Sequence, residues 1–380
     1  MLDVADLAGG GGPTAGGRPR FRRQAPGQLR LVEITGPAAL GDATEWMEQV
    51  HAELGVSLLA GRRWLESWTR AFPRWEPWVL TLLAGDEPLA VAPLTRRRGR
   101  SGVEVVSMGA SQLNESPVVA RDELGVAGLA ASIAHALESL DSPWSLRLPQ
   151  LPTGSPLTSA LQEYLAPTVV KPGSPRPVMR LDRSHAPARM LSSNTRSALA
   201  KARNRVEREG HRLQFEWVGE WARIRELLPE IMSIHRARDL ELRGMSLLDD
   251  PEEADFYQQV LVRHAELWRV LVVRIDEALA GYAICLADRR TLRVWDNRVS
   301  PYWRRYSAGL IANAEVVVSA AGDPAFDEVD WGCGVQRYKA SMSNQVVQAE
   351  TLQAWSSATL RARQGLTRRL QGHRWLPGGV

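Results

Sequence analysis

The chain has 380 residues, of which 44% are hydrophobic and 24% are charged. This composition is typical of a globular protein and excludes a collagen repeat, bulk disorder and a membrane-embedded bundle. The formal net charge is +4. Because Lys171, Lys201 and Lys339 are the only lysines, the remaining 44 basic residues are arginines, a bias that GC-rich coding explains as readily as phosphate recognition does.

The ends of the chain and its cysteines restrict the class further. Residues 1–30 are rich in Gly, Pro and Arg and have little to bury, which predicts a disordered arm. The arm lacks the apolar core of a secretory signal, and no run of 18 uncharged apolar residues occurs elsewhere. Cys285 and Cys333 have no metal-ligand spacing, so we expect neither a disulfide framework nor a metal. A cytoplasmic protein outside the membrane is expected.

The first half of the chain mixes helical and strand patterns. Trp64, Trp68 and Phe72 recur every four residues and therefore share one face of a helix. Alternating apolar runs predict an antiparallel meander. The expected elements are helices over 43–54, 57–72, 126–140 and 157–165 and strands over 77–83, 88–94, 103–108 and 144–148.

The second half repeats this plan after a stretch rich in proline. Residues 166–177 carry four prolines and a glycine, which predicts an interdomain connection with a boundary near 175. Beyond it we expect helices over 193–209 and 221–239 and strands over 267–275, 278–286 and 291–299. The fold class is therefore α/β (α+β), with two similar domains, each a mainly antiparallel twisted sheet flanked by helices. Their expected bounds are 31–174 and 175–360, followed by a basic tail over 361–380.

A strand, a cationic loop and a helix follow one another from residue 291 to 322. The spacing predicts that Ser307 caps a helix ending at Gly322. Small residues at its start leave the first N–H groups accessible to a pyrophosphate, whose charge the neighbouring arginines offset. The alternative is a capped surface helix after a basic turn. The expected phosphate cradle spans residues 299–310 and comprises Val299, Arg304, Arg305, Tyr306, Ser307, Ala308 and Gly309.

The spacing Arg304-x-x-Ser307-x-Gly309 resembles the Arg/Gln-x-x-Gly-x-Gly/Ala loop of Gcn5-related N-acetyltransferases (GNATs). In that family the loop holds the pyrophosphate of coenzyme A, so the resemblance implies acyl-CoA, acetyl-CoA above all, as co-substrate. Ser307 departs from the usual glycine, which puts close backbone approach in doubt.

A second resemblance lies in residues 325–339, AFDEVDWGCGVQRYK. They are similar to the pattern Phe-Asp-Phe-x-x-Gly-x-Glu-x-Tyr-Lys of the CelD-like (cellulose-biosynthesis-type) acetyltransferases, a GNAT group. The helix of Trp64 and Trp68, the basic helix of 195–208 and the segments 234–238 and 255–257 follow the same order. The resemblance covers residues 45–355 and implies a tandem GNAT architecture, which FemABX peptidyltransferases share while taking an aminoacyl group from tRNA.

The two halves differ in the predicted cradle. Residues 111–125, the corresponding part of the first half, are acidic and lack the cradle spacing. We therefore expect a degenerate first domain that shapes the acceptor cleft.

Acyl transfer to an amine calls for a base and for a proton donor to the leaving sulfur. Asp296, on the strand before the cradle, is the candidate base, or else a solvated carboxylate at a strand end. Tyr338 is the candidate acid, or else a tyrosine packed under its loop. Lys339 is one of three lysines in a chain that otherwise uses arginine, and it is assigned to a contact with phosphate or substrate. Gln336 stands where the CelD-like pattern has Glu, so a carboxylate role there is lost.

A basic cluster follows on the helix of 221–239. His235, Arg236, Arg238 and Arg243 are candidates to hold an anionic acceptor, or else they form a solvated helix end. The basic helix of 195–212 is a solvated face or, in a FemABX-like enzyme, a track for tRNA, although Glu207 and Glu209 reduce its field.

Three hypotheses follow. The leading one is an N-acyltransferase that moves an acyl group from a CoA thioester to an amine of a small molecule or peptide by direct attack. The second is a FemABX-like transferase dependent on aminoacyl-tRNA. The third is a non-catalytic binding protein that kept the GNAT fold. The sequence leaves the acceptor and the oligomeric state open.

Overall fold

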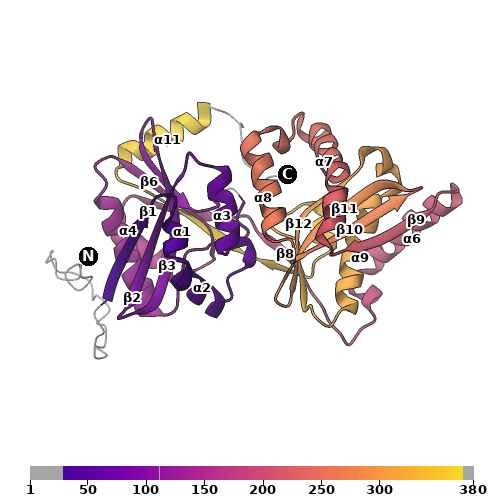
Figure 1. Ribbon diagram of the computed structural model, residues 1–380, viewed down its shortest axis with the longest axis horizontal. Helices are drawn as coiled ribbons and strands as arrows, with labels where there is room; N and C mark the ends of the chain where they lie inside the picture. The colour runs from indigo at the N-terminus through magenta and orange to yellow at the C-terminus, as the bar shows by residue number, and fades with distance from the viewer. Residues whose placement is uncertain (1–28, 111, 371–380) are drawn as a thin grey trace. The chain divides into compact units, whose positions relative to one another are not determined.

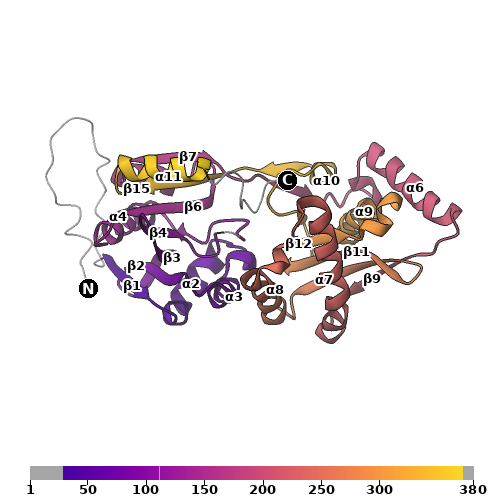
Figure 2. The ribbon, with the colours of Figure 1, turned by 90° about the horizontal axis from the view of Figure 1, so that it is seen from above.

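The computed structural model describes residues 29–110 and 112–370. The described residues form two compact units, one of 29–173 with 349–370 and the other of 174–348. Figures 1 and 2 show each unit as a sheet with helices packed on its faces. Of the expected disordered arm, residues 1–28 lie outside the described residues. Of the expected basic tail, 371–380 lie outside them and 361–370 belong to a helix.

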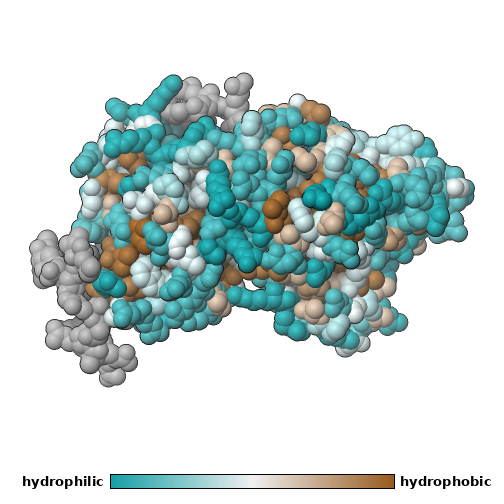
Figure 3. Space-filling model, viewed as in Figure 1, coloured by the Kyte–Doolittle hydropathy of each residue, from teal (hydrophilic) through white to brown (hydrophobic). Residues whose placement is uncertain are grey.

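The surface is polar over most of the face in Figure 3, with hydrophobic residues in small groups. In the described part of the chain, no helix has both the length and the apolar character needed to cross a membrane.

The sheet of the first unit is mainly antiparallel. Its strand order is β1-β2-β3-β4-β6-β15-β7, and a short β5 pairs with β3. The pair β4 and β6 is parallel. The strands are β1 Leu29–Thr35, β2 Glu76–Ala84, β3 Glu87–Gly99, β4 Gly102–Ser107, β5 Val119–Ala120, β6 Trp144–Pro152, β7 Thr168–Pro172 and β15 Ala349–Trp355.

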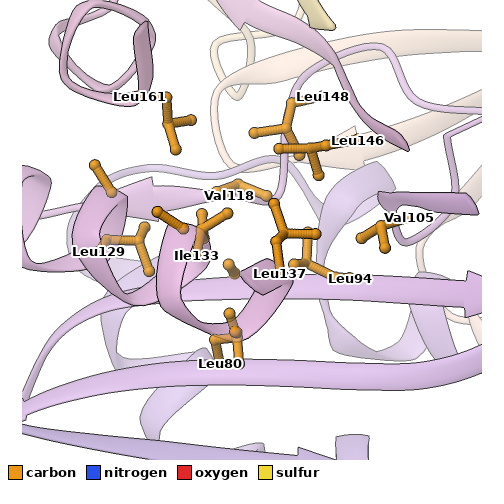
Figure 4. Close-up of a cluster of buried hydrophobic side chains, with 14 of the residues drawn as sticks. Leu80, Leu94, Val105, Val118, Leu129, Ile133, Leu137, Leu146, Leu148 and Leu161 are labelled. Carbon is orange, nitrogen blue, oxygen red and sulfur yellow. The ribbon is translucent and has the colours of Figure 1, made fainter. Parts of the chain in front are cut away.

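Helices α4 and α5 cover one face of this sheet. Their apolar side chains, Leu129, Ile133, Leu137 and Leu161 among them, pack against strand residues such as Leu80 (Figure 4). Removing such leucines from water supplies the main stabilisation, at about 1.5–3 kcal/mol each. The helices of the unit are α1 Ala39–Asp42, α2 Thr44–Glu53, α3 Arg62–Ala71, α4 Glu123–Glu138, α5 Pro156–Tyr164 and α11 Ala358–Leu370, with a 3-10 turn η2 at Leu58–Ala60.

Two features of this unit differ from the sequence expectation. The proline-rich stretch 166–177 contains β7 and the start of β8, although the two units divide between Gly173 and Ser174, close to the expected boundary near 175. The expected second domain ran to residue 360, whereas β15 lies between β6 and β7 of the first sheet. Strand β15 pairs with β6 along one edge and with β7 along the other. Both partners are distant in sequence, so the residues of β15 alone do not reveal this pairing.

The sheet of the second unit has the order β14-β8-β13-β12-β11-β10-β9. Only the β12–β13 pair is parallel among these described strands. The strands are β8 Arg176–Arg180, β9 Leu213–Val218, β10 Trp268–Ile275, β11 Ala278–Asp288, β12 Thr291–Val299, β13 Glu328–Asp330 and β14 Gln345–Val347.

Helices lie on both faces of this sheet, with α6 and α9 on one and α7 and α8 on the other (Figure 2). Helix α6 is capped at Ser192, whose Oγ accepts from the Thr195 amide at 3.1 Å, and Gly210 follows its end. The helices are α6 Ser193–Arg208, α7 Trp221–Arg243, α8 Pro251–Arg263, α9 Ala308–Gly322 and α10 Arg337–Ser341, with 3-10 turns η3 Pro187–Met190, η4 Leu247–Asp249 and η5 Pro301–Tyr306. The expected fold class, mainly antiparallel sheets flanked by helices in both units, is confirmed.

Candidate functional site

Strands β12 and β13 part in the middle of the second sheet. Their parallel pairing stops at Arg293 opposite Asp330, whereas β12 continues beside β11 to Val299. Residues 294–299 of β12 therefore have no strand on their β13 side in the described part of the chain. A ligand with amide groups can add to such an edge.

The parted end of β12 leads through η5 into helix α9. Gly309 permits a close approach there, since a Cβ at this residue would lie 2.8 Å from Cγ2 of Val299. The first helical bond runs from the Ile311 amide to the Ser307 carbonyl at 3.1 Å, so the N–H groups of residues 308–310 precede the helical ladder. Ala308 is fully buried.

Ser307 lies at the start of α9, but its side chain makes no capping bond. Its backbone is left-handed, with φ 57° and ψ 36°. The expected side-chain cap is therefore wrong. Ser307 instead turns the chain in a conformation that glycine adopts more easily, which agrees with the glycine of the motif that it resembles.

The cations of η5 have acidic partners. Arg304 pairs with Glu241 of α7, and Arg305 pairs with Glu209 at 3.2 Å. The Tyr306 ring is buried, and its hydroxyl donates to Glu209 at 2.7 Å and lies 2.7 Å from Nε2 of His211. Tyr306 thus anchors the loop, while both exposed arginines reach a phosphate only by leaving or sharing their carboxylates.

Asp296 lies at the centre of a buried polar network on the α7 and α8 face. Its Oδ2 accepts from the hydroxyls of Tyr257 at 3.0 Å and Tyr282 at 2.7 Å. Its Oδ1 pairs with Nη1 of Arg298 at 2.8 Å. The network continues to α7, where Nε of Arg298 lies 3.5 Å from Oδ1 of Asp239.

The environment keeps Asp296 ionised. Burial raises its pKa, but Arg298, His235 and the two tyrosine hydroxyls outweigh burial and hold the pKa below the usual value. A carboxylate with filled acceptor sites and a low pKa is a poor proton acceptor near neutral pH. Asp296 therefore does not have the properties expected of a general base.

His235 belongs to the same network and not to an exposed basic cluster. It is 4% exposed, with Nδ1 3.3 Å from Asp239 and Nε2 4.0 Å from Asp296. Burial lowers the pKa of His235, so the ring is neutral at pH 7. Arg236 lies 3.8 Å from Asp249, Arg238 pairs with Glu241, and Arg243 is exposed. His235, Arg236 and Arg238 thus have different acidic partners, whereas Arg243 acts electrostatically on His235.

Tyr338 lies next to the parted end of β12. Its hydroxyl donates to Oδ1 of Asn297 at 3.1 Å, and Nδ2 of Asn297 donates to Asn313 of α9 at 2.8 Å. Burial raises the pKa of Tyr338 to about 12, although the Asn297 contact lowers it. The phenol therefore stays protonated, and it can donate to a group beside Asn297 by exchanging its bond to Oδ1 of Asn297.

Lys339 is buried beneath the loop that follows β13. Its Nζ donates to the Cys333 carbonyl at 2.6 Å. Burial lowers the pKa of Lys339 to about 8. This placement favours support of the loop, so the phosphate contact that the rarity of lysine indicated has no geometric support.

Sequence reasoning missed Arg298, Tyr257, Tyr282, Asn297 and Asn313. The cause is a β-bulge, because the β11–β12 register shifts between Ile284 opposite Asp296 and Cys285 opposite Val294. Trp295 is the extra residue, so Asp296 lies on the α7 and α8 face and Asn297 on the α9 face. The Asp-Asn-Arg run of 296–298 at a strand end was the only signal available.

The first unit has an equivalent parallel pair, β4 and β6, and helix α4 lies between these two strands in the chain, as α9 lies between β12 and β13. The start of α4 differs from that of α9. Asp122 caps it by accepting from the Gly125 amide at 2.7 Å, and Glu123 lies in its first turn. The Asp122 carboxylate occupies the position that an anion takes at a helix start, and the charges of Asp122 and Glu123 repel an anion there.

Residues 193–340 match the family model of the acetyltransferase (GNAT) domain. The match includes β12, η5, α9 and Tyr338. No curated protein sequence matches the chain significantly.

Solved structures share the fold at low sequence identity. FemX has a TM-score of 0.60 at 9% identity, covering 89% of this chain and 100% of its own. A conserved protein of unknown function from Bacteroides thetaiotaomicron has 0.53 at 9%, covering 85% and 99%. The C-terminal domain of a protein assigned as a lysylphosphatidylglycerol synthetase from Agrobacterium fabrum has 0.52 at 13%, covering 85% and 96%. These identities show the fold alone.

Proposed function

We propose that the protein is an N-acyltransferase that moves an acyl group, acetyl in the simplest case, from a CoA thioester to an amine of a small molecule or peptide. The observation that carries the proposal is the parting of β12 from β13 directly before the start of α9. The GNAT domain match over residues 193–340 supports it. The finer resemblance to the CelD-like group stays a prediction.

In this proposal the donor lies along the parted edge of β12. Its pantetheine amides bond to the main chain of 294–299, and its pyrophosphate lies at the N–H groups of residues 308–310. Arg304 and Arg305 exchange Glu241 and Glu209 for phosphate oxygens. The two carboxylates then keep the loop ordered when the donor is absent.

The chemical step is a direct attack. The amine nitrogen forms a bond to the thioester carbon, the C–S bond breaks, and the proton lost by the amine balances the thiolate through solvent. The Tyr338 hydroxyl, which stays protonated, releases Oδ1 of Asn297 and donates its hydrogen bond to the sulfur as the charge on the sulfur develops. Asp296 and Arg298 hold the bulged strand in place and transfer no proton.

Titration calorimetry with acetyl-CoA tests the donor. We expect wild-type binding and about a tenfold or greater loss of affinity when Arg304 and Arg305 are both changed to Ala, because each charge-assisted contact contributes about 1.5–3 kcal/mol. Arg290→Ala, which removes an exposed arginine paired with Asp327, is the matched control. Tyr338→Phe should lower kcat by about tenfold or more while the affinity for acetyl-CoA changes little.

The FemABX-like alternative has one specific observation in its favour, namely the acidic partners that Arg304 and Arg305 already have. It requires aminoacyl-tRNA as donor, so ribonuclease treatment should abolish product. Binding of acetyl-CoA with turnover insensitive to ribonuclease would exclude it. If neither donor binds, the protein is a non-catalytic binding protein.

A further inference from the structure

Helix α6 carries three cations on one flank. Lys201, Arg205 and Arg208 are spaced by four and then three residues, so they form a stripe along one side of the helix. All three side chains are exposed. The buried residues Ala202 and Val206 face the core, and Glu207 lies on the opposite flank by helix spacing. We call these three residues the α6 stripe.

The α6 stripe adjoins the loop that leads into α9. Nη1 of Arg205 donates to the main-chain carbonyl of Arg305 at 2.6 Å. Beyond the helix, Glu209 and His211 both contact the Tyr306 hydroxyl at 2.7 Å. The C-terminal half of α6 and η5 are therefore held together, and Figure 2 shows α6 beside α9.

The charge of the α6 stripe is offset only in part, by the electrostatic interaction of Arg208 with Glu209. Among the described residues, none of its three side chains forms an ion pair, since the one bonded partner of Arg205 is a neutral carbonyl. By contrast, Arg203 on the other flank pairs with Glu315 at 3.4 Å, and both η5 arginines have glutamate partners. The stripe thus adds unpaired positive charge next to the proposed pyrophosphate position.

We infer that the α6 stripe binds the 3′-phosphate of the coenzyme A adenosine, with Arg205 as the residue that determines this specificity. The inference rests on the proposed function, and it is supported by the contact between Arg205 and the loop that leads into the proposed pyrophosphate position. The stripe spans only about 10 Å along the helix, which offers few contacts to an extended RNA backbone, whose binding depends on many phosphate contacts.

Calorimetric titrations with CoA and with dephospho-CoA, which lacks only the 3′-phosphate, test the inference. We expect the wild-type protein to bind CoA about tenfold more tightly than dephospho-CoA, as expected for one exposed charge-assisted contact. Arg205→Gln removes the charge but keeps a polar side chain on the exposed flank, and it should lower this ratio to about two or less. Arg203→Gln, on the other flank of α6, should leave the ratio at the wild-type value.

Each other outcome overturns a different statement. Equal wild-type affinities for the two ligands, or a ratio that Arg205→Gln leaves unchanged, would overturn the 3′-phosphate site but not the CoA donor. Absence of binding by both ligands would overturn the donor and the site with it. Binding of uncharged tRNA that is lost in Arg205→Gln, without discrimination between CoA and dephospho-CoA, would reassign the stripe to RNA.

Discussion

Ser307 holds a left-handed backbone conformation at φ 57° without a side-chain cap. This conformation costs an L-residue about 1–2 kcal/mol. A glycine avoids this strain but loses more conformational entropy on folding, so the net gain in stability is smaller than the strain. We expect Ser307→Gly to raise the melting temperature by about 2 °C, given about 2–4 °C per kcal/mol for a unit of this size. Ser307→Ala is the control, because it removes the hydroxyl but keeps the strain. Equal melting temperatures for the two variants would refute the strain argument.

His51 of α2 is a buried neutral histidine in the first unit. Its Nε2 lies 2.9 Å from the Pro117 carbonyl, and Nδ1 has no hydrogen-bond partner among the described residues. Burial lowers the pKa of His51 to about 4. Above pH 6.5 the ring is neutral in both the folded and unfolded states. Below pH 6.5 only the unfolded chain takes up the proton, so stability falls until about pH 4 is reached.

The resulting loss should be about 3 kcal/mol between pH 6.5 and pH 4, at about 1.4 kcal/mol per pKa unit. Urea unfolding of the wild type and of His51→Gln at several pH values measures it, because their difference isolates this group. We expect the wild type to lose its advantage over the variant as the pH falls. A difference that does not change with pH would show that His51 takes up its proton in the folded state.

At the scale of elements, the bulge in β12 and the ion network behind it hold the parted strand. Arg298 joins β12 to α7 through Asp296 and Asp239, both of which are buried. Removing the cation leaves these two carboxylates without their shared partner. Arg298 is therefore the side chain through which the end of β12 is tied to α7.

Arg298→Met should destabilise the protein by about 3–5 kcal/mol, as expected for breaking a buried ion pair. Arg290→Met, in the same unit, removes an exposed arginine whose partner Asp327 is also exposed, and it should cost less than about 1 kcal/mol. Urea denaturation measures both values. Similar losses for the two variants would indicate that water screens the Arg298 network.

Secondary structure was accessible from the sequence wherever a pattern was long and ended clearly. Helix α6 follows from Ser192 and Gly210, and the strands β10 to β12 follow from apolar runs separated by polar turns. Trp64 and Trp68 share the buried face that their spacing predicts. The bulge at Trp295 could not be foreseen, because it depends on the register with β11 and not on the residues of β12 alone.

At the scale of the molecule, the second unit is one continuous segment, 174–348, within a discontinuous first unit. The chain leaves and re-enters the first unit at neighbouring points, since the Gly173 amide donates to the Ala349 carbonyl at 2.8 Å. Strand β15 pairs with β6 and β7 on its two edges. Without it, the first sheet would be interrupted.

Fragments test this organisation. Residues 174–348 should unfold cooperatively when expressed alone. Residues 29–173 should not, but joining them to 349–370 through a short Gly/Ser linker should restore cooperative unfolding, because the linker spans neighbouring ends. Circular dichroism during urea unfolding measures each case. Cooperative unfolding of 29–173 alone would show that β15 is dispensable for the first unit.

The sequence by itself determined the fold class, the helices α2 to α7 and α9, and the strands β2 to β4, β6 and β10 to β12, because capping, turn and periodicity signals act between residues that are close along the chain. It also placed the cradle motif on the connection from β12 to α9, although the role of that motif stays a prediction. It did not reveal α8, α11 or the short strands. Tertiary structure alone decided that β15 joins the first sheet and that Asp296 lies in a buried network with Arg298, Tyr257 and Tyr282. Strand partners, bulges and buried charges depend on residues distant in sequence, and the sequence pattern does not encode which of them meet.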